Sequence, residues 1–319
     1  MRFIPLQPVV GRTLRPGVGA RIVALTLALT APAVLGCDVP VFRYALDHWP
    51  ADVFRLETST AVLQADPLAK EFRNLGNNGG LNLETAVSTN GTKLYFPAHV
   101  RGAEVPEWQG QLTPEIYHSL TDSPVRRDMV KHILNGDSAV WVLVESGRPE
   151  LDEPAAKLLQ DRLKFLEVAT GLPHLDPTDP DSQIGPGPDL KVQFSLLRVK
   201  RNNPLEREFL SLLAGPGGLK RFPENEPFFA AVFGRGRVLG AWGNDRVNED
   251  FIRETAQFLL GSCSCEVKSL NPGWDLLLRV DWDDELLKIG RARAAAAGDK
   301  SPDGQSLQPQ TVIIRPDEN

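Results

Sequence analysis

Three cysteines are the residues of this chain whose type and spacing could do chemistry: Cys37, Cys263 and Cys265. Cys263 and Cys265 are separated by one serine, and three kinds of chemistry fit such a pair. The thiols could form a disulfide, with each other or with Cys37, or they could form a reducible redox centre. Their thiolates could also bind Cu(I) or zinc, but a tetrahedral zinc site would need further ligands. The histidines that could supply such ligands are scattered without ligand spacing: His48, His99, His118, His132 and His174.

The residues before Cys37 have the composition of a secretory leader. They include four arginines and no acidic residue, and residues 22–35 are largely apolar. A positive segment followed by a short apolar run and a small residue is typical of a cleaved signal peptide. The apolar run is shorter than the roughly 20 residues that a membrane-spanning helix needs. The sequence therefore predicts a signal peptide over residues 1–36 and an exported protein, either periplasmic or secreted.

The end of the leader, Val34-Leu35-Gly36-Cys37, resembles the lipobox of bacterial lipoproteins. The resemblance implies that Cys37 is lipidated, becomes the mature N-terminus and anchors the protein to the periplasmic face of a membrane. Asp38 then implies retention at the inner membrane. Lipidation would also explain an odd cysteine count in an oxidising compartment. Two other interpretations stay open: an uncleaved anchor, or cleavage after Ala31-Pro32-Ala33 with Cys37 as a buried thiol.

Net charge limits the classes of partner. The chain of 319 residues has a formal charge of −6 and its first 37 residues carry +4, so the remainder carries −10. So acidic a protein is a poor match for nucleic acid or for an anionic membrane surface. The sequence therefore predicts no nucleic-acid partner, and contact with a membrane only through a lipid on Cys37. About 280 residues remain after the leader, which suits two domains.

In the first domain, predicted over residues 37–136, short β-type segments alternate with helix signals. Asn90-Gly91 is a tight-turn signal, so the strands on either side of it, 81–88 and 92–98, are predicted to form a hairpin. Further strands are predicted at 53–60 and 105–110. Helices are predicted at 41–49, at 66–75, and after the N-cap and proline pairs Thr113-Pro114 and Ser123-Pro124.

The second domain, predicted over residues 137–289, has a clearer order of elements. Apolar runs predict strands at 139–144, 192–199, 228–233 and 237–242. Helices are predicted at 153–169, from the capping box at Asn203-Pro204-Leu205-Glu206 onward, and from Asn248 to about residue 260. Residues 290–319 are rich in Ala, Pro and Asp and are predicted to be a disordered tail.

The order strand, helix, strand, helix, strand, strand, helix in the second half is that of a thioredoxin fold. Residues 226–239 resemble the thioredoxin segment in which a cis-proline opens a strand and a glycine turn leads to the next. The resemblance implies an α/β, thioredoxin-like domain with Pro227 as its structural cis-proline. The first half has a similar order but lacks the helix expected between residues 88 and 92, which favours a second, eroded copy. Another α/β sandwich with the same element order is the alternative.

Thioredoxins act through a Cys-x-x-Cys motif between the first strand and the first helix. Here that stretch, residues 145–154, contains no cysteine, which excludes dithiol exchange at that site. No Ser-His-Asp order, P-loop or dinucleotide motif occurs in its required context, and no cofactor is predicted.

These observations favour an exported, membrane-anchored bacterial protein without enzymatic activity, which binds or scaffolds a protein partner in the cell envelope. An atypical thiol oxidoreductase or copper carrier that uses Cys263 and Cys265 is the alternative. Residues 37–46 and 263–268 look similar to stretches of uncharacterised exported bacterial proteins with a thioredoxin-like domain, a resemblance that implies no activity.

Overall fold

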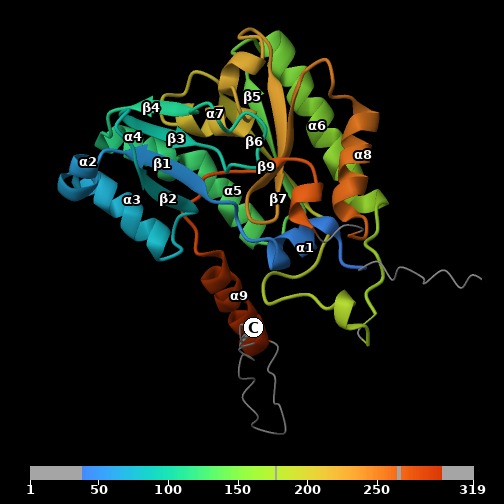
Figure 1. The fold of residues 1–319 in the computed structure, drawn as a ribbon. Coiled ribbons are helices and arrows are strands. Elements are labelled where there is room, and N and C mark those ends of the chain that lie inside the picture. Colours follow the sequence, from blue (N-terminus) through green and yellow to red (C-terminus); the bar gives the residue numbers. More distant parts are fainter. Residues whose placement is uncertain (1–37, 177, 264–266, 297–319) are drawn as a thin grey trace, which may run out of the picture. The chain divides into compact units, whose positions relative to one another are not determined.

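Two mixed β-sheets organise the chain, which the computed structural model describes over residues 38–176, 178–263 and 267–296 (Figure 1). In each sheet, the strand that comes first in the sequence lies between the second strand, to which it is parallel, and the third strand, to which it is antiparallel. The fourth strand pairs with the third in antiparallel orientation. The chain is therefore an α/β protein, as predicted. The first sheet contains, in spatial order, β2 (Leu83–Val87), β1 (Phe54–Thr58), β3 (Thr92–Tyr95) and β4 (Trp108–Gly110). The second contains β6 (Phe194–Lys200), β5 (Ala139–Glu145), β7 (Phe228–Phe233), β8 (Arg237–Gly243) and β9 (Trp274–Asp275).

The predicted hairpin around Asn90-Gly91 is wrong. β2 and β3 do not pair with each other but lie on opposite sides of β1. Two strands that flank a third are about 10 Å apart, and the four residues 88–91 can span about 13 Å, so a short turn is long enough to cross the end of β1. Gly91 has a φ of 82° in this connection, which explains the glycine at that position.

β5 is buried along its length because helices cover both faces of the second sheet. Trp141 and Leu143 pack on one face against α6 (Pro149–Ala169) and α8 (Glu249–Leu260), which lie side by side (Figure 1). Val142 points to the opposite face, into the cluster that contains α7 (Arg207–Ala214). Since strand side chains alternate between faces, a strand covered on both sides must be continuously apolar.

β1 alternates instead. Phe54, Leu56 and Thr58 are buried, whereas Arg55 and Glu57 between them are partly exposed. Arg55 pairs with Glu57 and its guanidinium lies 4.7 Å from the centre of the Tyr95 ring, so this face of the first sheet is polar. The apolar face packs in one cluster with side chains from the helices α2 (Thr60–Ala65), α3 (Pro67–Asn77), α4 (Pro114–Thr121) and α5 (Pro124–Leu134).

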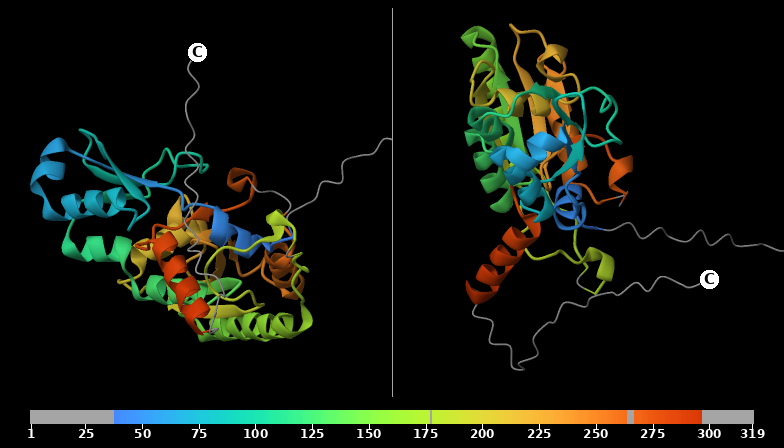
Figure 2. Two further views of the ribbon diagram at one scale, coloured as in Figure 1. Left: turned by 90° about the horizontal axis from the view of Figure 1, so that it is seen from below. Right: turned by 60° about the vertical axis from the view of Figure 1, so that its left-hand side comes forward.

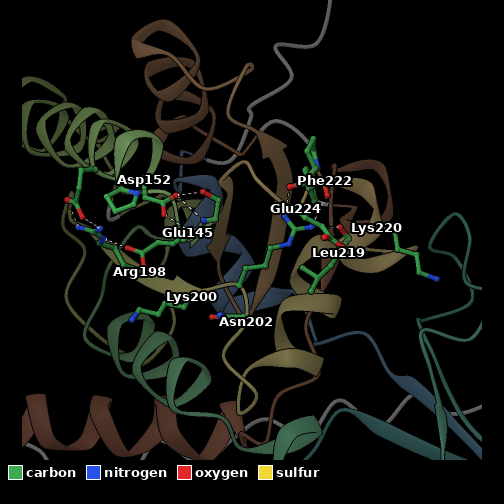
Figure 3. Close-up of a pocket in the computed structure, with 15 residues that line it drawn as sticks. Glu145, Asp152, Arg198, Lys200, Asn202, Leu219, Lys220, Phe222 and Glu224 are labelled. Atoms are coloured by element: carbon green, nitrogen blue, oxygen red, sulfur yellow. Dashed lines mark hydrogen bonds and ion pairs between the residues drawn. The ribbon is translucent and has the colours of Figure 1, made fainter.

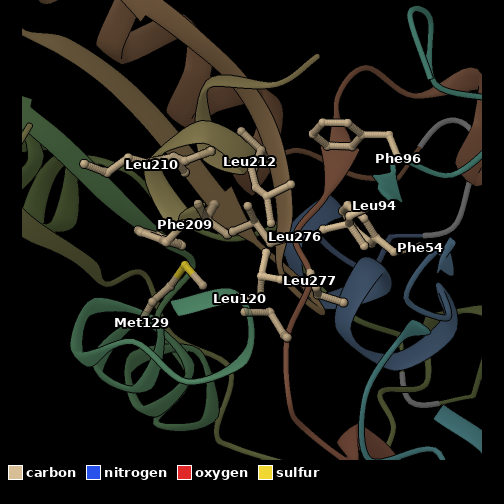
Figure 4. Packing of buried hydrophobic residues seen from close by; sticks show 14 of the residues in the cluster. Phe54, Leu94, Phe96, Leu120, Met129, Phe209, Leu210, Leu212, Leu276 and Leu277 are labelled. Atoms are coloured by element: carbon tan, nitrogen blue, oxygen red, sulfur yellow. The ribbon is translucent and has the colours of Figure 1, made fainter. Parts of the chain in front are cut away.

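The two halves share one hydrophobic core, shown in Figure 4. The apolar face of the first sheet and the α7 face of the second both belong to it, together with the segment that follows β9. Asn82 fastens this segment to the first half: its amide donates to the carbonyls of Asp52 and Leu276 and accepts from the Leu278 N–H, at 2.8–3.0 Å. The residues labelled in Figure 4 are Phe54, Leu94, Phe96, Leu120, Met129, Phe209, Leu210, Leu212, Leu276 and Leu277.

The first helix, α1 (Val41–His48), packs with the second half, although the sequence places it in the first domain. Phe42 and Ala45 lie in the cluster that contains α6 and α8. The residues before α1 pair with the residues after α8, through a bridge between Pro40 and Ser262 and a 2.9 Å hydrogen bond from the Cys263 N–H to the Val39 carbonyl. The start of the described chain is therefore folded onto the second sheet.

The disordered tail predicted over residues 290–319 is wrong for residues 290–296. The helix α9 (Trp282–Ala296) includes residues 290–296, and residues 297–319 lie outside the described residues. In α9, Arg293 donates to the Gly187 carbonyl at 2.6 Å, which joins the helix to the long loop between α6 and β6 (Figure 2). Short 3-10 helices occur at η1 (Pro180–Ser182), η2 (Gly218–Arg221) and η3 (Lys268–Leu270).

Two helices of the second half begin at other residues than predicted. α6 begins at Pro149, four residues early, because proline suits the first turn of a helix. α7 begins at Arg207, after the predicted capping box, and Leu205 is 61% exposed. The Asn203 side chain accepts a hydrogen bond from the Leu205 N–H, so it forms a local turn and does not cap the helix.

Candidate functional site

A cleft of about 1030 Å³ opens where the parallel strands β5 and β6 end (Figure 3). The carboxyl ends of parallel strands are where open α/β sheets usually bind ligands. Three segments line the cleft: residues 145–153 from the end of β5 and the start of α6, residues 198–202 from the end of β6, and residues 219–224 from η2 onward. The first segment contains the loop in which the thioredoxin resemblance would place an active site.

The carboxylate of Asp152 forms the hydrogen bonds that stabilise this loop. Asp152 is 4% exposed, and one carboxylate oxygen accepts from both the N–H and the hydroxyl of Ser146, each at 2.9 Å. The other oxygen accepts from the Gly147 N–H, also at 2.9 Å. The backbone donors before α6, and the partial positive charge at its N-terminus, are therefore compensated by a side chain of the same helix. Such donors would otherwise stabilise a thiolate or a bound anion at this position.

The two walls of the cleft differ in charge. On the α6 side, Arg198 contacts Glu145 at 2.6 Å and Glu153 at 2.5 Å, and its hydrogen bonds lower the pKa of Glu153. On the opposite side, Arg201 donates to the carbonyls of Leu219, Phe222 and Pro223 at 2.7–2.8 Å.

Burial lowers the pKa of the Arg201 guanidinium, which forms no ion pair with an acid among the described residues. Lys200 and Lys220 lie on the same wall together with one acid, Glu224, and all three are exposed. This side of the cleft has a net positive charge and is called the basic wall. The cleft can therefore supply hydrogen bonds and a basic surface. Among the described residues that line it, none is a cysteine or a histidine, and the hydroxyl of Ser146 donates to Asp152 without a histidine to activate it.

Pro227 precedes β7 and does not line the cleft. The described residues contain no cis peptide bond, so the bond before Pro227 is trans and the predicted cis-proline is wrong. The turn at residues 223–226, which a hydrogen bond from the Glu226 N–H to the Pro223 carbonyl closes, comes directly before Pro227. The trans isomer, which X–Pro bonds favour slightly, is sufficient there.

Cys263 is buried, at 2% exposure, among side chains of α1 and α8. β7 begins next to the end of β5, where the cleft lies, and at the other end of β7 Gly234 lies against Ala45 of α1. Cys263 and the cleft are therefore at opposite ends of the second sheet. Cys37 and Cys265 lie outside the described residues, and within the described ranges no cluster of three or more His, Cys, Asp or Glu is arranged to hold a metal ion.

The structure brings together a serine, a histidine and an aspartate that the sequence order does not suggest. The Ser195 hydroxyl lies 2.8 Å from His132 Nδ1 and also hydrogen-bonds to Asp137. Asp137 is 3.1 Å from the same Nδ1 atom. In a catalytic triad the acid and the serine contact different ring nitrogens, so that the nitrogen beside the serine can accept its proton while the acid orients the ring. Here both contact one nitrogen, so the cluster anchors the buried Asp137 and is not a triad.

Sequence reasoning identified the loop at residues 145–154 but not the other two segments that line the cleft. Asp152 has one local signal, since an acid in the first turn of a helix is favourable. Arg201 and Lys220 have no such local signal, because the segments that contain them are separated in the sequence and line one cleft only in the folded protein.

The predicted signal peptide and its lipidation site, residues 1–37, lie outside the described residues. Of the helices within the described ranges, none is both long and apolar enough to cross a membrane. In comparisons with known proteins, the chain matches no family model and shows no significant similarity to any curated protein sequence.

Proposed function

We propose that this chain is an exported bacterial protein with two thioredoxin-like domains, which lacks the catalytic dithiol and binds a protein partner through the cleft beside Asp152. Three lines of support are the leader, the order of the strands and the chemistry of the cleft. The carrying observation is that the cleft is open at the expected active-site position, while the loop that forms it has no thiol and its donors are satisfied by Asp152.

The second sheet supports the thioredoxin-like assignment. Its strand order, β6-β5-β7-β8, with one parallel and two antiparallel pairs, is the order that thioredoxin domains use. The first and third helices, α6 and α8, pack on one face, and the second, α7, packs on the other. The first sheet supports a second copy, because β2-β1-β3-β4 repeats the same pairings without a helix between β2 and β3.

The basic wall of the cleft defines the kind of partner. Lys200, Arg201 and Lys220 face the cleft without an acid ion-paired to them in the described ranges, and the α6 wall offers Glu145 and Glu153 already paired to Arg198. An extended segment of a partner protein that carries acidic side chains would complement this arrangement. Positive charge in the cleft of an acidic protein would also orient the partner as it approaches.

A photo-crosslinking residue in place of Asn202, which lines the cleft, tests this proposal in the native envelope. We expect one discrete crosslinked partner, which disappears when Lys200→Glu and Lys220→Glu are added. The matched control places the same probe at Lys157, on the exposed surface of α6 outside the cleft. No crosslink from position 202, or the same products from both positions, would overturn the proposal.

The anchor proposed at Cys37 has a separate test. Val39 and Val41 are buried, so a lipid at Cys37 would hold the folded domain close to the membrane without a long linker. The intact mass of the mature protein from the membrane fraction should begin at Cys37 and include a diacylglycerol-type adduct. A mass that begins elsewhere or lacks the adduct would remove the anchor and leave the cleft proposal unaffected.

A further inference from the structure

A second pocket, of about 400 Å³, shares no lining residue with the cleft and is lined by basic side chains. Its walls come from the turn that contains His99 and Arg101, from η2 with Arg221, and from β8 with Arg237. Trp274 forms an aromatic wall. Among the described residues that line it, none is an aspartate or a glutamate.

Behind the pocket, a buried ion cluster holds Arg237 in place. The guanidinium, whose side chain is 4% exposed, contacts Asp275 at 3.1 Å and the Asn271 carbonyl at 2.8 Å. Lys268 contacts both Asp275 and Asp52, and Asp52 also lies 3.2 Å from His99 Nε2. Two cations and two carboxylates balance in this cluster, so it forms a fixed, nearly neutral floor.

Arg221 and Arg101 add positive charge that this cluster does not balance. Within the described ranges, neither forms an ion pair with a carboxylate. Arg221 is held by its surroundings: its guanidinium lies 5.9 Å from the centre of the Trp274 ring and donates to the Ala214 carbonyl. Gly215 makes this packing possible, since a Cβ there would come within 2.7 Å of Trp274 and 2.9 Å of Arg221.

We propose that this pocket binds a small oxyanion, a phosphate or a carboxylate group, between Arg101 and Arg221. Guanidinium groups bind both kinds of oxyanion through paired N–H donors, and an arginine already fixed by stacking loses less entropy when it binds. The Ser269 hydroxyl lines the same pocket and can donate to the anion. A local excess of positive charge is unusual in a chain with a net charge of −6. The pocket and the cleft share no lining residue, so anion binding here does not depend on partner binding at the cleft.

Isothermal titration calorimetry of the purified protein with inorganic phosphate, and separately with malonate, tests the proposal. We expect saturable binding of at least one of the two, and the anion that binds identifies the group recognised. Arg101→Ala and Arg221→Ala should each weaken that binding by about tenfold or more, because each removes charge-assisted hydrogen bonds. Arg101 is exposed, so its substitution should leave the fold intact.

Lys220→Ala is the matched control, because Lys220 is next to Arg221, is exposed and lines the cleft instead of this pocket. It removes the same charge and should leave binding within about twofold of the unmodified protein. Binding of neither anion at millimolar concentration would overturn the proposal. Equal weakening by Lys220→Ala and Arg101→Ala would also overturn it, since that would indicate a general charge effect and no defined site.

Discussion

β1 and β5 hold the same place in two sheets with the same strand order, but β1 is apolar on one face and β5 on both. The cause is the connection after the second strand of each sheet. After β6 the chain forms α7, which covers one face of the second sheet. After β2 it makes only the turn at residues 88–91, and the face that a helix would cover carries Arg55 and Glu57.

Two sheets can therefore have the same strand pairings although one of them lacks a helix layer on one face, provided that this face is polar. Polar side chains at alternate positions leave the hydrogen-bond ladder unchanged, since they alter only one face. The remaining apolar face of the first sheet then joins the core that contains α7 and α4 (Figure 4). One helix of the second half thereby contributes to the burial of both sheets.

The largest effects are expected from a matched set of glutamine substitutions that compares the two strands. Val142→Gln and Leu143→Gln, on opposite faces of β5, should each lower the free energy of unfolding by about 3–5 kcal/mol, because each buries an amide in a fully covered position. Leu56→Gln should cost a similar amount. Arg55→Gln, on the polar face of β1, should cost less than about 1 kcal/mol. Urea unfolding measures all four.

The contrast between Leu56 and Arg55 decides this test. If Arg55→Gln destabilises the protein as much as Leu56→Gln, the polar face of the first sheet is covered after all, and the comparison with β5 is wrong. If Val142→Gln is tolerated, the α7 face of β5 is not closed.

An intermediate effect is expected at the start of the helix that follows the first strand of each sheet, α2 after β1 and α6 after β5. Asp152 accepts two backbone N–H groups and one hydroxyl at the start of α6, whereas Ser59 caps α2 through a single 3.2 Å bond to the Val62 N–H. Asp152→Ala should cost about 2–3 kcal/mol, and Ser59→Ala about 1 kcal/mol. Thermal unfolding of both variants would sharpen the comparison, and a larger loss from Ser59→Ala would contradict it.

A smaller, pH-dependent effect is expected at Glu107, just before β4, where the first sheet meets α7. Burial raises the pKa of this carboxyl, although it accepts hydrogen bonds from Ser211 and the Gly217 N–H. A raised pKa means that the folded state holds the proton more tightly than the unfolded state does. Its contribution is therefore present below the unfolded pKa and is lost as pH rises through the folded pKa.

Glu107→Gln cannot ionise and should lack this loss. The free energy of unfolding of the variant, relative to the unmodified protein, should rise with pH from the ordinary glutamate pKa of 4.5 up through the raised pKa of the folded state, and then level off. Denaturant unfolding at several pH values measures the difference. If the difference in unfolding free energy does not change with pH, burial does not raise the pKa of Glu107, and water reaches this carboxyl between the first sheet and α7.

The parts of the fold that the sequence predicted are those with a strong local signal. β5 and β7 are almost continuously apolar, and Asn248 caps α8, because its side chain accepts from the Phe251 N–H at 2.9 Å. The hairpin at Asn90-Gly91 failed because a turn signal shows where the chain reverses and not which strand it pairs with next. Partner choice depends on the apolar face of β1, which is a property of the whole first half.

The candidate site was less predictable for the same reason. The absence of cysteine from residues 145–154 could be read directly, and it excluded dithiol exchange at that position. The basic wall could not be predicted in this way. It depends on the hydrogen bonds from Arg201 to three carbonyl groups of residues 219–223, and the sequence spacing does not indicate that these groups lie together.

The smallest effect is expected from removal of the two C-terminal thiols, because Cys263 lies at the opposite end of the second sheet from the cleft. Cys263→Ala with Cys265→Ala should leave the crosslink from position 202 unchanged. It should also leave unchanged any insulin disulfide reduction or copper uptake measured for the protein. Cleft variants and cysteine variants thus separate the two functions by position: loss of the crosslink with Lys200→Glu and Lys220→Glu supports binding at the cleft. Loss of reduction or copper uptake in the cysteine variant, with the crosslink retained, would instead support a thiol oxidoreductase or copper carrier built at the other end of the same sheet.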